Sequence, residues 1–205
     1  MFRSNGQTNY DVVYESLRNR LSRVDREHAV QSLGANRHRD GLSVKLLGRT
    51  CLVTRDEIQA ADGKPLAITS RLCLAYYLLH AGRGNLEQTW VAYRDFKDGA
   101  FFHTAYAQLV ENEIAGTFAG RLPRLRETVD RIGGEVLPTD SGGDLCAKFL
   151  MLPRIPLSVV FYDADDDFPA SARVLYDASA TRFLDMECLA VLGLILKDEL
   201  CDTHF

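Results

Sequence analysis

The feature that most constrains this fold is a change in the spacing of its apolar residues after Gly133-Gly134. Just before this pair, apolar residues recur every three or four positions, which is typical of helices that bury one face. After it the period becomes two, and Leu145–Leu152 and Leu157–Tyr162 are predicted to be strands. Only Pro153–Pro156 separates these runs, and so short a connection favours antiparallel pairing. The chain therefore predicts an α+β fold rather than alternating βα units.

The other elements are predicted from periodicity and from turn residues. Helices are expected over residues 10–24, 66–80, 103–118, 122–132 and 186–200. Further short strands are expected over residues 42–47, 50–54, 90–96 and 173–176, with Gly48-Arg49 as the turn of the first hairpin. We expect residues 1–205 to form a single α+β domain, with a mainly antiparallel sheet of about five short strands packed with four or five helices.

Charge and hydropathy exclude two broad classes of function. The formal net charge of −4 leaves no basic field to hold nucleic acid or an anionic membrane. The longest apolar stretches, near residues 72–79 and 188–196, are well short of the ~20 residues that a membrane span needs. The first residues include no apolar signal segment. We therefore expect a soluble, cytoplasmic protein that binds neither nucleic acid nor membrane.

No pattern of metal ligands stands out in the sequence. The five cysteines have no CxxC-like spacing, and the five histidines form no HExxH motif, so we expect no metal and no cofactor. The acidic segment Asp163–Asp167 fails as an EF-hand loop because Phe168 and Val174 stand where glycine and glutamate are required. A loose site for a divalent cation and an exposed acidic loop tip both stay open for this segment.

The candidate site lies where residues 90–102 are expected to meet residues 168–177. Trp90, Arg94 and Phe102 offer flat apolar area beside a guanidinium group, which suits an organic anion or a partner's side chain. Arg173 and Asp177 would lie on one face of an extended strand. The candidate ligand-binding residues are Trp90, Arg94, Phe102, His103, Asp163, Ser171, Arg173 and Asp177.

A simpler interpretation of the same residues also stays open. A lone tryptophan commonly lies in the core, and His103 beside two phenylalanines is more often a packed residue at a helix start than a base. The polar groups of residues 168–177 would then satisfy one another within a tight strand and turn.

Several segments resemble a known family of bacterial and archaeal proteins of roughly 200 residues, which is catalogued only as a domain of unknown function. The matching segments span most of the chain: residues 9–11, 65–79, 90–94, 99–102, 152–157 and 168–180. The resemblance implies relatives that are frequent in anaerobes and sometimes carry a short Cys-rich iron–sulfur segment. That segment is not found in this sequence, so no iron–sulfur role is carried over. The resemblance implies no activity and no catalytic residues.

Two classes of function are therefore carried forward. The first is an accessory module that binds a protein partner or a small organic anion, in anaerobic redox or cofactor metabolism. The alternative is an enzyme acting on a small organic anion, with a site assembled in the fold from Asp163, Arg173, Asp177 and His103. A deep pocket holding two or more of these side chains would favour the enzyme or ligand-binding interpretation.

Overall fold

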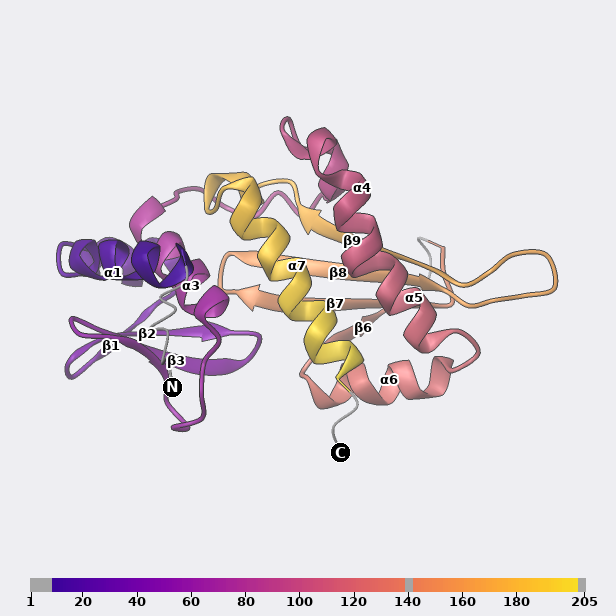
Figure 1. Ribbon diagram of the computed structural model, residues 1–205, viewed down its shortest axis with the longest axis horizontal. Helices are drawn as coiled ribbons and strands as arrows, with labels where there is room; N and C mark the ends of the chain where they lie inside the picture. The colour runs from indigo at the N-terminus through magenta and orange to yellow at the C-terminus, as the bar shows by residue number, and fades with distance from the viewer. Residues whose placement is uncertain (1–8, 139–141, 203–205) are drawn as a thin grey trace, which may run out of the picture.

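The computed structural model describes residues 9–138 and 142–202, and it contains two antiparallel sheets (Figure 1). The smaller sheet has the order β1-β2-β3-β4, and the larger has the order β5-β9-β8-β7-β6. The strands are β1 (Asn36–His38), β2 (Gly41–Leu46), β3 (Arg49–Thr54), β4 (Ile58–Ala60), β5 (Trp90–Ala92), β6 (Glu135–Leu137), β7 (Leu145–Leu152), β8 (Ile155–Tyr162) and β9 (Ser171–Asp177). The predicted α+β class is confirmed.

Helices cover one face of the larger sheet and flank the smaller one (Figure 1). The α-helices are α1 (Asn9–Leu21), α2 (Arg26–Leu33), α3 (Ile68–His80), α4 (His103–Tyr106), α5 (Asn112–Phe118), α6 (Leu122–Arg131) and α7 (Met186–Cys201). Short helical turns of other types are η1 (Tyr93–Asp95), η2 (Gly99–Phe101), the π-helical η3 (Ala107–Glu111) and η5 (Ala180–Arg182). None of the helices in the described ranges has the length and apolar character needed to cross a membrane.

The two predicted strands of the C-terminal third form the centre of the larger sheet. β7 and β8 pair from Leu145 opposite Phe161 to Leu152 opposite Ile155, so their connection is a two-residue turn. β9 pairs with the other edge of β8, from Tyr176 opposite Leu157 to Ser171 opposite Tyr162. The antiparallel arrangement expected from the short connection is thus present in three successive strands.

The strands form two sheets rather than one, and several boundaries differ from those expected. The first hairpin turns at Leu47-Gly48, one residue earlier than Gly48-Arg49, and Arg49 already pairs with Leu46. Leu47 and Gly48 both have positive φ angles, 45° and 75°, as a two-residue turn with right-handed strand twist requires. Strands β1, β4 and β6, with three residues each, are too short to show a period.

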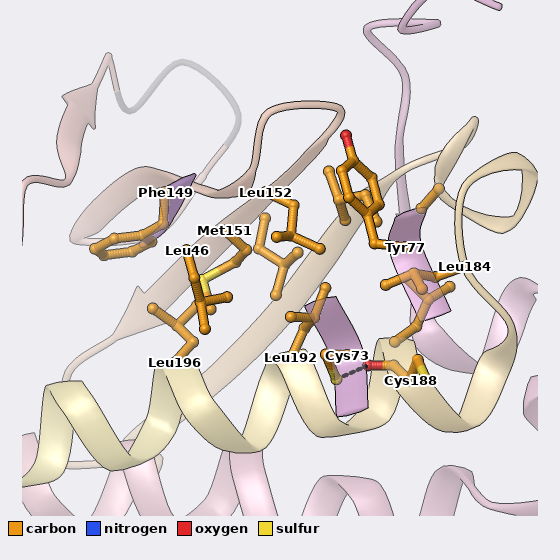
Figure 2. Packing of buried hydrophobic residues seen from close by; sticks show 14 of the residues in the cluster. Leu46, Cys73, Tyr77, Phe149, Met151, Leu152, Leu184, Cys188, Leu192 and Leu196 are labelled. Carbon is orange, nitrogen blue, oxygen red and sulfur yellow. Dashed lines mark hydrogen bonds between the residues drawn. The ribbon is translucent and has the colours of Figure 1, made fainter. Parts of the chain in front are cut away.

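One continuous cluster of buried side chains extends over both sheets and the helices packed on them, and the sheets meet directly where β2 contacts β7. Figure 2 shows Leu192 and Leu196 of α7 directed into this cluster, beside residues of α3, β2 and β7. Cys73 and Cys188 are buried in it, as predicted, and the Cys73 Sγ lies 3.7 Å from the Cys188 carbonyl oxygen. α7 is therefore a core helix, as its apolar residues on most faces indicated.

Gly193 of α7 allows the ring of Tyr106 to contact the helix backbone. A Cβ atom at Gly193 would lie 2.2 Å from the Tyr106 hydroxyl oxygen. We expect Gly193→Ala to lower the free energy of unfolding by about 1–3 kcal/mol, because overpacking outweighs the better helix propensity of alanine.

The matched control is Gly116→Ala in α5, where a Cβ atom would meet nothing within 4 Å. There the same change should stabilise the protein by up to about 1 kcal/mol. Urea titration of both variants measures the difference. Equal effects of the two substitutions would show that Tyr106 does not pack against α7 as described.

Candidate functional site

An open edge of β9 defines the candidate site. β5 pairs with β9 only from Trp90 opposite Asp177 to Ala92 opposite Leu175, and the chain then turns away in η1. The backbone N–H of Val174 therefore has no partner on β5. Glu111 takes the place of a strand there, because its Oε1 accepts a hydrogen bond from the Val174 N–H at 2.9 Å. A helix side chain is thereby held against the edge of the sheet.

A π-helical turn gives Glu111 its position. The helix expected over residues 103–118 forms as α4 and α5, but the two are joined by η3. In this wider turn the Asn112 N–H bonds to the Ala107 carbonyl, five residues earlier. Such turns change the direction of the side chains that follow them and are frequent at functional sites. Here the turn ends at the residue that contacts β9.

Two guanidinium groups, one imidazole and one carboxyl group, from four elements, line a small cavity at this edge, with a volume of about 80 Å³. They are Arg94 of η1, His103 of α4, Glu111 of η3 and Arg173 of β9. The remaining lining residues are Ala92, Tyr93, Tyr106 and Ala107. Three of the eight residues predicted from the sequence, Arg94, His103 and Arg173, are therefore brought together.

Burial and charge act on Glu111 in opposite directions. Desolvation raises the pKa of its carboxyl group, while the Val174 N–H and the positive charges of Arg173 and Arg94 lower it, and the pKa is raised overall. The two guanidinium groups are exposed, and Arg94 also lies 3.6 Å from Asp95. With Glu111 ionised and His103 neutral, the four lining groups carry a net charge of +1.

Uncharged tyrosines form an apolar wall of the cavity. Tyr93 and Tyr106 stack with their ring centroids 4.5 Å apart and their planes 10° from parallel. The Tyr106 and Tyr176 hydroxyls are 2.7 Å apart, and Tyr176 donates to the Leu189 carbonyl at 2.9 Å. Desolvation raises the pKa of all three tyrosines, so their hydroxyls stay protonated at neutral pH.

His103 is fixed at the start of α4 by local hydrogen bonds. Its Nδ1 lies 2.7 Å from the Ala100 carbonyl, which can only accept, so Nδ1 carries a proton. Its Nε2 lies 3.3 Å from the Thr104 hydroxyl. The ring is exposed and lines the cavity.

Trp90 and Asp177 lie at the other end of the β5–β9 pair and do not line the cavity. Asp177 is 2% exposed and accepts hydrogen bonds from the backbone N–H groups of Glu87, Gln88 and Ser179, and from the Ser179 hydroxyl. Burial alone would raise its pKa, but these hydrogen bonds lower the pKa overall. Asp177 therefore anchors the loop that leads into β5.

Phe102 directly precedes α4 and lines a second hollow of about 410 Å³, which lies between α4, η3 and α7. The lining of this groove is mostly apolar, and its one charged residue in the described part of the chain is Glu187. Phe102 is 63% exposed at its rim. Because the groove offers no cation, it does not suit the organic anion expected from the sequence.

Asp163 and Ser171 lie at the far end of the β8–β9 hairpin from Asp177. The Asp163 carboxylate accepts hydrogen bonds from the N–H groups of Gly120 and Ala164, at 2.6 Å and 2.8 Å. Asp165 accepts similar bonds within its own loop, from Asp167 and Phe168. Within residues 9–138 and 142–202, no group of three metal-ligating side chains could hold a metal ion.

Glu111 is the charged residue of the cavity that sequence reasoning missed. It belongs to no motif, and its neighbours give an ordinary amphipathic helix. One signal was available, because residues eight positions apart share a face of a helix, and Glu111 is eight positions after His103. The contact with β9 was not predictable, since it depends on β5 ending at Ala92.

The fold and the cavity define an α+β protein with a small cationic cavity at the open edge of its larger sheet. A family model described as a domain of unknown function, DUF3786, matches residues 25–198. The chain therefore belongs to this family, in agreement with the resemblance noted in the sequence. Comparison with curated proteins and with solved structures found no match.

Proposed function

We propose that the protein is a binding module for a small organic anion, which is held in the cavity between Arg94, His103, Glu111 and Arg173. The observation that carries this proposal is the convergence of two guanidinium groups on one cavity from elements far apart in the sequence. The planar fork of a guanidinium matches the two oxygens of a carboxylate.

The size of the cavity limits the class of anion. Its volume of about 80 Å³ is between two and three times the roughly 30 Å³ share of one water molecule in the liquid. The space suits a carboxylate head group with one or two further carbon atoms. The apolar wall of Tyr93 and Tyr106 would contact those carbons. Acetate is therefore the probe of choice.

An enzyme acting on the same anion is the second candidate. It is supported by the presence of a carboxyl group with a raised pKa and an imidazole in one cavity, which are the groups that general acid–base chemistry uses. Of the four residues considered for such a site from the sequence, only Arg173 and His103 line this cavity. Acetate or propionate recovered unchanged after incubation with the protein would favour the binding module.

Titration with acetate, followed by backbone amide shifts in NMR spectra, tests the proposal. We expect saturable binding whose largest shifts occur at residues 92–94, 103–111 and 173–174. Arg173→Gln removes one guanidinium group and should weaken binding at least about tenfold, which corresponds to 1.4 kcal/mol.

Arg37→Gln is the matched control, because Arg37 is an exposed arginine of the smaller sheet that pairs with Glu27. This change should leave the affinity for acetate unaltered. Absence of saturable binding to the wild-type protein, or equal affinity in the Arg173→Gln variant, would overturn the proposal.

A further inference from the structure

Glu111 is the one group in the cavity that works against anion binding. An anion in a space of about 80 Å³ must lie within a few ångströms of the Glu111 carboxylate. Two carboxylates at such a distance cannot both stay ionised at low cost, and pairs of this kind commonly share one proton. The two guanidinium groups offset part of this repulsion but cannot remove it, because both are exposed to solvent.

We propose that the cavity binds a weak carboxylic acid together with one proton, which is shared between the ligand and Glu111. This inference rests on the proposed function and names its ligand class. The ionised acid and one proton from solvent bind to the ionised site, and no other bond forms or breaks. The site therefore prefers carboxylates, which can share a proton, to permanent anions such as chloride or nitrate.

The groups that face Glu111 from each neighbouring element agree with this inference. Positive charge comes from Arg94 of η1 and Arg173 of β9, and His103 of α4 adds to it when protonated. The side chains of Tyr106 and Tyr176, which also lie near Glu111, are uncharged. Burial already raises the pKa of Glu111 despite the two arginines, and a second carboxylate would raise it further.

The hydrogen bond from β9 engages only one of the two carboxylate oxygens of Glu111. Val174 N–H bonds to Oε1 of Glu111 at 2.9 Å, so Oε2 is the oxygen that would carry the shared proton. Glutamine at this position keeps a carbonyl acceptor for the Val174 N–H but cannot exchange a proton. Glu111→Gln is therefore a near-isosteric test that preserves the contact with β9.

Isothermal titration calorimetry with acetate tests the inference, at several pH values between 5.5 and 7.5. Each titration is run in two buffers with different heats of protonation and without carboxylate groups. For the wild-type protein we expect the uptake of close to one proton per acetate, and an affinity that falls up to tenfold for each unit of rising pH. Chloride and nitrate at equal concentration should compete at least tenfold less well than propionate.

Each outcome separates this inference from the proposed function. Acetate binding with equal heats in both buffers and an affinity independent of pH would overturn the shared proton and leave anion binding intact. No acetate binding at any pH would overturn both. The Glu111→Gln variant should bind acetate without proton uptake. Unchanged proton uptake in this variant would show that another group, such as His103, takes up the proton, and would contradict the inference. The wild-type comparison does not depend on the folding of the variant.

Discussion

Replacing Asp177 by alanine is expected to lower the free energy of unfolding by about 3 kcal/mol. The change removes a buried carboxylate that accepts four hydrogen bonds, and the loss of charge-assisted bonds of this kind costs about 1.5–3 kcal/mol, with a further penalty for buried donors left unpaired. The N–H groups of Glu87 and Gln88 are near the surface, so water limits that penalty. Denaturant titration at pH 7 measures the effect.

The effect of Asp177→Ala depends on pH in a defined direction. Because the folded state lowers the pKa of Asp177, the ionised carboxylate stabilises the fold above the unfolded-state pKa, about 3.9. That stabilisation is lost as the pH falls through the lower pKa of the folded state. The difference between wild type and variant should therefore be constant from pH 7 to about 5 and shrink below about 4.

Asp165→Ala is the matched control for Asp177→Ala. Asp165 also accepts two local backbone hydrogen bonds, from Asp167 and Phe168, but it is exposed in the loop after β8. Its removal should cost less than about 1 kcal/mol, because water replaces the lost bonds. A cost for Asp177→Ala as small as this would mean that the anchor before β5 is not formed.

The second large effect is expected at Leu192. This side chain of α7 is completely buried beside α3 and β7 (Figure 2). Leu192→Ala should therefore leave a cavity and lower the free energy of unfolding by about 2–5 kcal/mol. Leu109→Ala serves as the control because Leu109 is 56% exposed, and its cost should stay under about 1 kcal/mol. Comparable losses for the two variants would show that α7 does not pack into the core as described.

The elements that were predicted correctly are long and strongly patterned. α7 has apolar residues on nearly every face, and β7 and β8 each have eight residues, so their burial is evident in the sequence. The strands that were missed have three residues, fewer than two periods of alternation. The separation into two sheets was not predictable, because it depends on which short strands pair.

The two segments named from the sequence come together, but only three of the eight residues named with them line one cavity. Residues 90–102 and 168–177 do meet, through the pairing of β5 with β9. The register of that pairing places Trp90 opposite Asp177, whereas Arg94 and Arg173 lie beyond the end of β5. Sequence spacing gives no information on register between distant strands, so these two sets of residues could not be separated in advance.

The most direct test of the central claim is a crystal structure of the protein grown at pH 5.5 in saturating acetate. We predict electron density for one acetate ion in the cavity, with its oxygens toward Arg94 and Arg173 and with one oxygen at hydrogen-bond distance from Glu111. Ordered water alone in a cavity of unchanged shape, in a crystal saturated with acetate, would contradict the account.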